Sequence, residues 1–359
     1  MNRKSKTITR DDVAELAGVA PSTVSNVINK KGNVSEKLKK RIEWAIEELG
    51  YKPNLIARSL ITKSSKHIGL IIDEITNPHF ALLAKGAHNE ANKFGYVLSI
   101  SLASEHVDSV IEDFISRQFD GIIFNTYMSE VSPKMSELII KSGIPYVDCN
   151  GITEHGSILL EIDYYSGMKD AYYYLTSLGH EKIAYISGTP PPPPGEYSRP
   201  ERLDAFRWCC DHFGRKHYDD YIVLGDPPYF TNFEKGYQYG QQLLKRNLDI
   251  TAIIAVNDYT AIGVLQALKE SDIRVPEDIS LISFDNTVYA QSSNPSLTSL
   301  SSPVFTIGAK AVEYIVRQKE TPAEHRKKIV ERFPMELVIR ESTAPCLLNS
   351  DQNHVQGDR

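Results

Sequence analysis

Carboxylate side chains stand at the ends of several apolar runs of strand length. Asp73 follows HIGLII, Asp148 ends PYVD, and Asp285 ends ISLISFD. In an open parallel sheet such positions lie at the carboxyl ends of the strands, where ligands bind. Carboxylates there accept hydrogen bonds from vicinal hydroxyls, so this set is typical of a binding site for a polyol.

Donor and aromatic side chains occupy comparable positions. Arg202 opens a helical stretch after PPPPPGEYSRPE, and Asn257 ends AIIAVN. His79 and Phe80 follow the first strand, and an aromatic face packs well on the apolar C–H groups of a sugar. Plainer interpretations stay open: Asp258 as the cap of the next helix, His79 as a solvent-exposed side chain, and Phe80 as part of a lobe core.

The elements that would position these residues begin at Lys66, where strand-length apolar runs start to alternate with helical stretches. The runs are HIGLIID, YVLSISLA, GIIFNTY and PYVDCN, then KIAYISG, YIVLGD, AIIAVND and ISLISFDN. This alternation predicts an α/β fold of parallel sheets covered by helices. The two series separate near residue 160, which predicts two lobes of similar size with the polar residues between them.

The first 52 residues have another pattern, that of three short helices. Thr9 is expected to cap the first helix together with Asp12, and Gly18 to end it. Pro21 suits the first turn of the next helix, and so tight a connection predicts a helix-turn-helix. Ser35 is expected to cap the third helix and Gly50 to end it. The predicted buried stripes are Val13, Leu16 and Ala17 in the first helix, and Leu38, Ile42, Ala45, Ile46 and Leu49 in the third.

The second predicted helix, in APSTVSNVIN, has one polar face without Glu or Lys. Its apolar residues Val24, Val27 and Ile28 share the other face. In a helix-turn-helix the second helix enters the major groove, where short polar side chains reach base edges and Asn can pair with adenine. The polar face therefore predicts DNA contacts by Pro21, Ser22, Thr23, Ser25, Asn26 and Asn29, with Thr9 beside them.

The charge distribution agrees with a head that meets a polyanion. Residues 1–66 hold 14 Lys and Arg against 7 Asp and Glu, a net charge of +7. The whole chain has a net charge of −6, so the remainder has −13. A basic head on an acidic body favours a nucleic-acid partner for the head.

The stretch DVAELAGVAPSTVSNVINKKGNVSEKLKKRIEWAIEELGYKPNLIARSL resembles the DNA-binding headpiece of the lactose-repressor/galactose-repressor (LacI/GalR) family. The resemblance continues through RVPEDISLISFDN, SLTSL and MELVIRES and covers about residues 8–344. It implies a headpiece and hinge helix followed by a two-lobed, periplasmic-binding-protein-like body. It also implies that Pro21, Ser22 and Asn26 read the operator. Ala20 departs from the family, which usually has a capping Ser there.

The segment LIARSL, which Asn54 could cap, is too short to be a stable helix alone in water. The resemblance implies that it is a hinge helix, which pairs with its twin across a dimer and enters the minor groove. Ala57 and Leu60 are its expected DNA contacts, with Leu60 as the wedge between base steps. A plain linker is the alternative. The predicted domains are 1–52 (headpiece), 53–65 (hinge), 66–344 (effector binding and dimerisation) and 345–359 (a disordered tail).

The resemblance also implies an effector site between the lobes. Its positions match Asp73, Phe80, Asp148, Arg202, Asn257 and Asp285, and we add His79 and Phe230 as further candidates. Purine-binding members have an Arg near the position of Glu196, so this chain is not expected to bind a purine. No leucine heptad follows Glu341, and tetrameric members have one there, so a homodimer is expected.

Taken together, these patterns predict a cytoplasmic, nucleoid-associated repressor of sugar-metabolism genes, controlled by a sugar or sugar derivative. An enzyme is not expected, because the chain has no GxGxxG after a strand, GxxxxGK[ST], HExxH or GxSxG. The four cysteines lack CxxC spacing, so no metal or cofactor is expected. The basic N-terminus lacks an apolar segment, which disfavours a transport-type binding protein. Control by a protein co-regulator stays open.

Overall fold

The computed structural model describes residues 8–29, 32–52, 64–103, 107–127, 131–149, 158–188, 201–226, 231–322 and 325–347. The chain forms two compact units, Met1–Ser65 and Lys66–Arg359. Within the described ranges, none of the helices combines the length and the apolar composition that crossing a bilayer requires.

The first unit is a bundle of α1 (Arg10–Ala17), α2 (Pro21–Ile28) and α3 (Glu36–Leu49). The predicted capping box is confirmed, because Asp12 N donates to Thr9 Oγ1 and Thr9 N donates to Asp12 Oδ2. Gly18 and Gly50 end α1 and α3 in the left-handed region, with φ of 59° and 60°, which suits glycine because it lacks a Cβ.

Two details of this bundle differ from the sequence prediction. Leu16 is 40% exposed, and Ala14 instead joins the core. Ser35 does occupy the N-cap position of α3, but its side chain accepts no capping hydrogen bond. The core is otherwise the predicted one, with Val13, Val24 and Ile42 fully buried.

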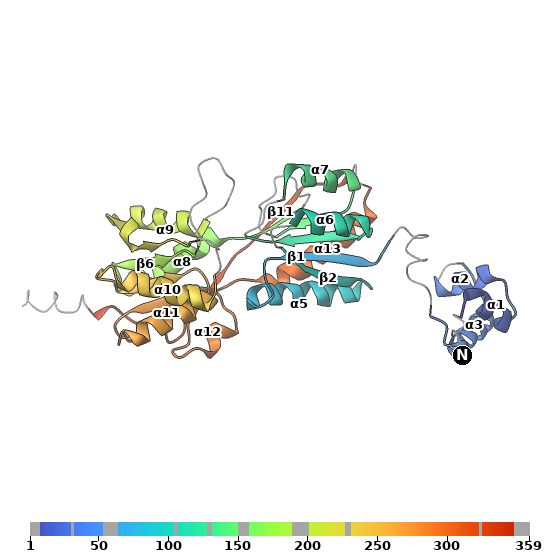
Figure 1. The fold of residues 1–359 in the computed structure, drawn as a ribbon, viewed down its shortest axis with the longest axis horizontal. Helices are drawn as coiled ribbons and strands as arrows, with labels where there is room; N and C mark the ends of the chain where they lie inside the picture. The colour runs from blue at the N-terminus through green and yellow to red at the C-terminus, as the bar shows by residue number, and fades with distance from the viewer. Residues whose placement is uncertain are drawn as a thin grey trace, which may run out of the picture. The chain divides into compact units, whose positions relative to one another are not determined.

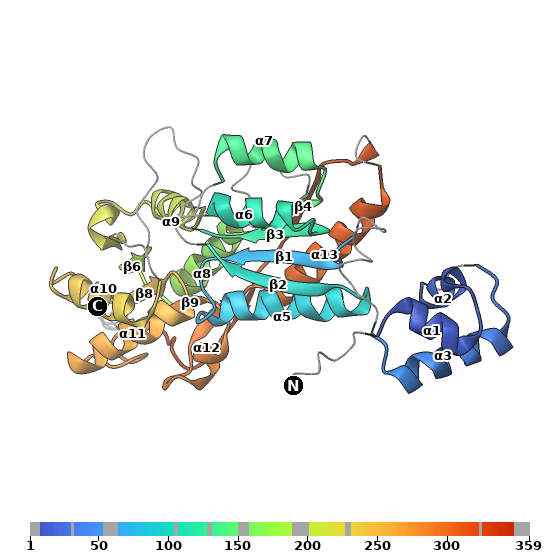
Figure 2. The same ribbon diagram turned by 45° about the vertical axis from the view of Figure 1, so that its right-hand side comes forward.

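The second unit contains two lobes, each built on a six-stranded sheet (Figure 1). In the first lobe the strand order is β11-β5-β4-β3-β1-β2, and all neighbours are parallel. Helices α5 and α13 share one buried cluster with the sheet, and α6 and α7 cover its other face (Figure 2). The bounds are β1 His67–Ile72, β2 Val97–Leu102, β3 Gly121–Asn125, β4 Tyr146–Asp148, β5 Ile158–Ile162, β11 Ile329–Phe333, α5 Pro78–Lys93, α6 Val107–Ser116, α7 Pro133–Ser142 and α13 Val304–Glu320.

In the second lobe the strand order is β12-β10-β9-β8-β6-β7. Helices α8 and α9 cover one face, and α10 and α11 cover the other. The bounds are β6 Ile183–Ile186, β7 Ile222–Val223, β8 Ala252–Ala255, β9 Ser280–Asp285, β10 Thr298–Ser301, β12 Glu336–Val338, α8 Tyr164–Ser177, α9 Glu201–His212, α10 Phe233–Leu244, α11 Asp258–Glu270, α12 Val288–Ser292 and the 3-10 helix η1 Tyr218–Tyr221.

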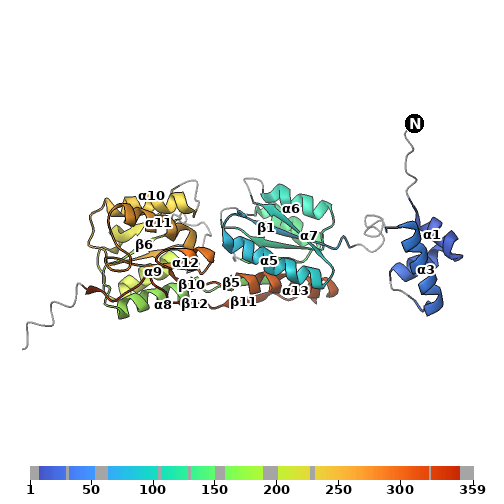
Figure 3. The ribbon, with the colours of Figure 1, turned by 90° about the horizontal axis from the view of Figure 1, so that it is seen from below.

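The lobes do not divide at a single point in the sequence. The chain passes from the first lobe to the second after β5, as predicted, but returns after β10 to form α13 and β11 in the first lobe. It then crosses again to β12, which is antiparallel to β10, so the second sheet is mixed rather than wholly parallel. Figure 3 shows β5, β10, β11 and β12 gathered where the lobes meet. These four short strands were not among the predicted runs.

Candidate DNA-contact face and inter-lobe site

The polar face of α2 points outward as predicted. Pro21, Ser22 and Asn26 are exposed, while Val24 on the opposite side is fully buried in the three-helix core. Ala20 supplies no side-chain cap, so the amides at this helix start can donate to a DNA phosphate. The structure thus leaves the predicted base-reading side chains accessible.

Most of the other predicted DNA contacts are partly buried or already hydrogen-bonded, and two lie outside the described residues. Thr23, Ser25 and Asn29 are half-buried, and Asn29 Nδ2 lies 3.3 Å from Ser25 Oγ, so the two residues bond to each other. Thr9 is exposed, but its hydroxyl serves the cap of α1. Ala57 and Leu60 lie outside the described residues.

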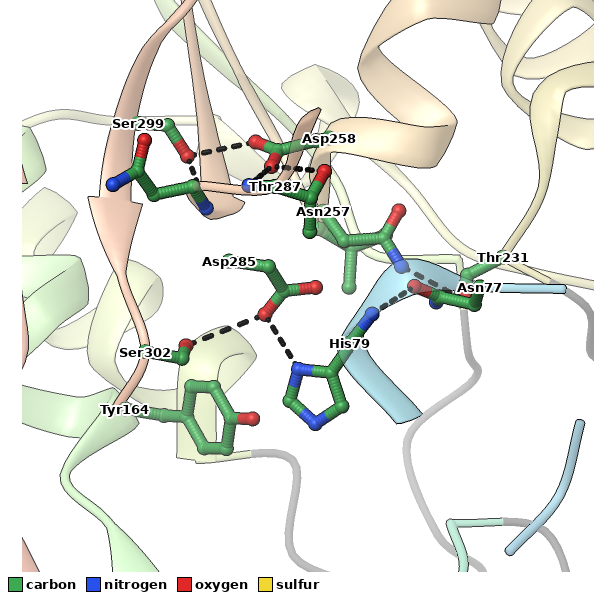
Figure 4. A network of polar contacts seen from close by, with 12 residues as sticks. Asn77, His79, Tyr164, Thr231, Asn257, Asp258, Asp285, Thr287, Ser299 and Ser302 are labelled. Carbon is green, nitrogen blue, oxygen red and sulfur yellow. Dashed lines mark hydrogen bonds and ion pairs between the residues drawn. The ribbon is translucent and has the colours of Figure 1, made fainter. Parts of the chain in front are cut away.

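Between the lobes, His79 meets Asp285 (Figure 4). His79 is in the first turn of α5, where its N–H donates to the capping Asn77 Oδ1. Its Nδ1 lies 3.1 Å from Asp285 Oδ1, and both side chains are nearly inaccessible, at 4% and 6% exposed. The interpretation of His79 as a solvent-exposed side chain is therefore wrong.

Asp285 is held in place by its own lobe. It ends β9 with a positive φ of 96°, a conformation that costs energy for a residue with a Cβ and occurs at functional sites. Ser302 Oγ donates to its Oδ1. Burial works to raise the pKa of Asp285, but the neighbouring His79 and Arg202 outweigh burial and hold the pKa below its ordinary value.

Arg202, in the first turn of α9, lies against aromatic rings. Its guanidinium carbon is 4.2 Å from the ring centroid of Tyr164 and 5.5 Å from that of Phe284, which stabilises a cation. Its Nη1 donates to Val256 O at 2.7 Å. A guanidinium has five N–H donors, so the arrangement fixes the group while leaving it capable of binding a hydroxyl.

Two tyrosines complete the site, and neither was predicted. The hydroxyls of Tyr127, after β3, and Tyr164, at the start of α8, lie 2.9 Å apart. Tyr127 Oη is also 3.5 Å from His79 Nε2. Tyr127 follows GIIFNT, a strand-end position like that of Asp73, and this position was the only sequence feature that could have indicated it as a site residue. Tyr164 follows β5, a strand that was not predicted.

The remaining predicted effector residues differ in whether they lie at the inter-lobe site or inside the first lobe. Asp73 Oδ2 accepts from Tyr127 N at 2.6 Å and so positions that tyrosine. Phe80 belongs to the first-lobe core, yet its ring edge also meets His79 and Tyr127. Asp148 is fully buried at the end of β4, which fits a place inside the lobe better than contact with a ligand. Phe230 lies outside the described residues.

The residue that caps α11 is Asn257, which was expected in the effector site, and not Asp258. Asn257 is the cap of α11, because its Oδ1 accepts from Thr260 N, and its Nδ2 donates to Thr231 Oγ1. Asp258 is therefore not the cap. Its buried carboxylate accepts hydrogen bonds from Ser283 Oγ, Ser299 Oγ, Thr287 N and Thr287 Oγ1 (Figure 4).

Asp258 gives a pH-dependent prediction. Burial and the charge of Asp285 raise its pKa to about 6, although the hydrogen bonds from Ser283, Ser299 and Thr287 oppose the rise. An unfolded chain loses this proton near pH 4, whereas the folded chain keeps it to about pH 6. The folded state therefore loses about 3 kcal/mol of stability at this residue as pH rises through that window.

Urea unfolding of the wild type and Asp258→Asn at pH 4, 5, 6 and 7 measures this effect. The stability of the wild type relative to the variant should fall by about 2 kcal/mol between pH 4 and pH 6, because the slope approaches about 1.4 kcal/mol per unit only midway between the two pKa values. Asp249→Asn, at a carboxylate 77% exposed, is the matched control. A difference that stays constant with pH would contradict the assignment.

Comparisons with known proteins identify the family. Residues 9–54 match the model of bacterial regulatory proteins of the lacI family, and residues 172–343 match a periplasmic binding protein-like domain. Catabolite control protein A of Priestia megaterium is 32% identical over 342 residues, which cover 94% of this chain and 99% of that protein. The chain belongs to the LacI family. The predicted membership of this family is thus confirmed. As a LacI-family member, the protein is a DNA-binding transcriptional regulator and not an enzyme.

Solved structures agree with this LacI-family fold. A lac repressor dimer bound to operator and the anti-inducer ONPF has a TM-score of 0.80 at 25% identity, covering 94% of this chain and 100% of that chain. A LacI-family regulator from Enterococcus faecium with bound ribose has a TM-score of 0.68 at 27% identity, covering 78% and 99%. The predicted headpiece and two-lobed body are therefore confirmed.

Proposed function

We propose that this regulator is a homodimeric repressor of carbohydrate genes, whose affinity for its operator is set by a sugar or sugar derivative bound between the lobes. The observation that carries the proposal is the inter-lobe site of His79, Tyr127, Tyr164, Arg202 and Asp285. Carboxylate, guanidinium and phenol groups beside aromatic rings suit a polyol. The ribose-bound relative from Enterococcus faecium supports a sugar as the ligand class.

We further propose the division into a headpiece (1–52), a hinge (53–65) and an effector-binding and dimerisation body (66–344). Residues 53–63 lie outside the described part of the chain. Of the predicted tail, the structure describes 345–347, where Cys346 N donates to Leu178 O. As a regulator acting on DNA, the protein is expected in the cytoplasm and, we propose, on the nucleoid.

We propose that the dimer surface includes β2. This strand is at the edge of its sheet, and its Val97, Ile100 and Leu102 are 54%, 45% and 48% exposed. An edge strand with exposed apolar side chains is a site for pairing unless something covers it. The operator-bound lac repressor is a dimer, and a second copy of this chain is the proposed occupant.

A thermal-shift screen tests the ligand class. Sugars, sugar phosphates and nucleosides are added singly to the full chain. A ligand at 100 times its dissociation constant should add about 2.7 kcal/mol of stability. We expect a sugar or sugar derivative to stabilise the protein and nucleosides to leave it unchanged. If only a protein from lysate binds, irrespective of added sugars, control by a co-regulator replaces the proposal.

Asn26→Ala should weaken operator binding by about 1–3 kcal/mol and leave binding to random DNA nearly unchanged. The reason is that Asn26 is exposed on α2 one turn after Ser22, where its amide can pair with a base edge. Fluorescence anisotropy on the operator and on scrambled DNA measures both affinities. Asn92→Ala, in the second unit, is the control. Equal losses on both DNAs would show that Asn26 does not read bases.

A further inference from the structure

The two lobes are joined by direct contacts between side chains. His79 belongs to α5 of the first lobe and Asp285 to β9 of the second, yet their Nδ1 and Oδ1 atoms are 3.1 Å apart. The Tyr127–Tyr164 hydroxyl pair lies beside them and also links to His79. Figure 4 shows the imidazole pointing directly at the carboxylate.

The first-lobe partner is fixed by close helix packing. Asn77 caps α5 and holds the backbone of His79. Gly86 of α5 and Gly308 of α13 let the two helices approach so closely that a Cβ at either would lie about 2 Å from a backbone oxygen of the other helix. His79 therefore has little freedom to withdraw while its lobe stays intact.

The second-lobe partner is equally fixed. Asp285 has a positive φ of 96° and receives a hydrogen bond from Ser302. The next residue, Asn286, also has a positive φ, and its side chain accepts from Arg340 Nη2. The loop after β9 thus aims the carboxylate out of its own lobe, toward His79.

The position of His79 matters for any ligand. A hydroxyl bound between the lobes would donate a hydrogen bond to a carboxylate, and Asp285 already receives such a bond from His79. A buried carboxylate that loses its partner is strongly destabilised. His79 therefore supplies, from the protein itself, a contact that a bound hydroxyl would otherwise supply.

We propose that His79 is a built-in ligand of Asp285, an inter-lobe latch that holds the two lobes together. Closure by the latch follows from the contact alone. One consequence rests on the proposed function: an effector that bonds to Asp285 competes with His79 and shifts the protein away from the latched state only by its differential affinity for the two states.

The lobe separation can be measured without DNA or effector. Spin labels are placed by Lys134→Cys on α7 and Gln242→Cys on α10, two exposed positions in different lobes. The background is Cys346→Ser, because the other three cysteines are buried. Labelled full-length chain is diluted into excess unlabelled chain so that distances within one protomer dominate, and double electron–electron resonance gives their distribution.

The labelled chain with native His79 and Asp285 should show one narrow distribution of distances between the two spin labels. His79→Phe, which keeps a flat ring without the donor, should shift the distribution to longer and broader distances, and Asp285→Ala, which removes the acceptor, should do the same. The double variant should match the single variants. His88→Phe, at an exposed histidine on α5, should change nothing.

Two results would overturn the latch. One is a distribution unchanged in both His79→Phe and Asp285→Ala. The other is opening by only one of these two variants, because the contact requires both partners. Neither result depends on whether the protein binds a sugar, so failure of the latch and failure of the proposed effector are distinguishable.

Discussion

Arg202→Ala should abolish the response of operator binding to effector, while the affinity for operator without effector stays near that of the wild type. Arg202 is held between Tyr164, Phe284 and the Val256 carbonyl. Deleting one partner of a buried charged contact costs about 2–5 kcal/mol, so effector affinity should fall by about 30-fold to several thousand-fold. Calorimetry with the sugar found by the screen measures the loss.

Arg207→Ala is the matched control, because Arg207 is on the same helix but is 35% exposed and pairs with Asp219. It should keep both effector affinity and response. Asp285 is a less suitable choice, since its loss would also release His79. An Arg202 variant that no longer binds effector yet shows the full change in operator affinity would refute the inter-lobe mechanism.

The proposed coupling runs from lobe closure to the hinge. An effector that favours one closure changes the spacing of the two hinges in a dimer. A segment as short as LIARSL cannot hold a helix alone, so we propose that a small change in this spacing forms or melts the paired hinge helices. The coupling free energy expected for such a device is about 1–3 kcal/mol.

Ile100→Asp should convert the protein to monomers and lower operator affinity by at least about 100-fold. In a two-fold interface the same residue is used by both subunits, so the substitution places two carboxylates in one apolar contact. Burying an unpaired charge costs several kcal/mol, and 1.4 kcal/mol is tenfold in affinity. Sedimentation velocity at micromolar concentration and anisotropy on operator measure the two effects.

Ile140→Asp is the control for this substitution. Ile140 is 57% exposed on α7, a comparable side chain away from β2. It should leave the protein dimeric and able to bind operator. If Ile100→Asp also stays dimeric with unchanged affinity, the interface is not at β2.

Local sequence patterns predicted the helical head and most strands because those features depend on neighbouring residues. The helix start at Thr9 and Asp12, the helix end at Gly18 and the next helix start at Pro21 each depend on residues only three or four positions apart. The structure agrees with the prediction at all of these positions. The predictions that failed depend on contacts between residues far apart in the sequence, or on which of two neighbouring side chains the core covers. Leu16 has the right spacing for burial, but the small bundle covers Ala14 instead.

The inter-lobe site was likewise predicted only as far as local sequence patterns allowed. Strand ends indicated Asp73 and Asp285, but the contact of His79 with Asp285 joins residues 206 positions apart and depends on how two lobes meet. Tyr164 was missed because β5, at the crossover between the lobes, was not recognised as a strand, so no strand end pointed to this residue. Sequence alone could not decide which residue caps α11, because Asn and Asp can both cap a helix. The contacts of Asp258 with Ser283, Thr287 and Ser299 leave the cap to Asn257.

Selection of bound duplexes from a random DNA library by the full-length chain tests the central claim, sequence-specific recognition by a dimer. The account predicts one enriched pseudo-palindrome of roughly 14–20 base pairs, since a two-fold protein reads a two-fold site. The selected site should bind at least about 10³-fold more tightly than a scrambled duplex of the same composition. Enrichment of no motif, or equal affinity for the selected and scrambled duplexes, would contradict it.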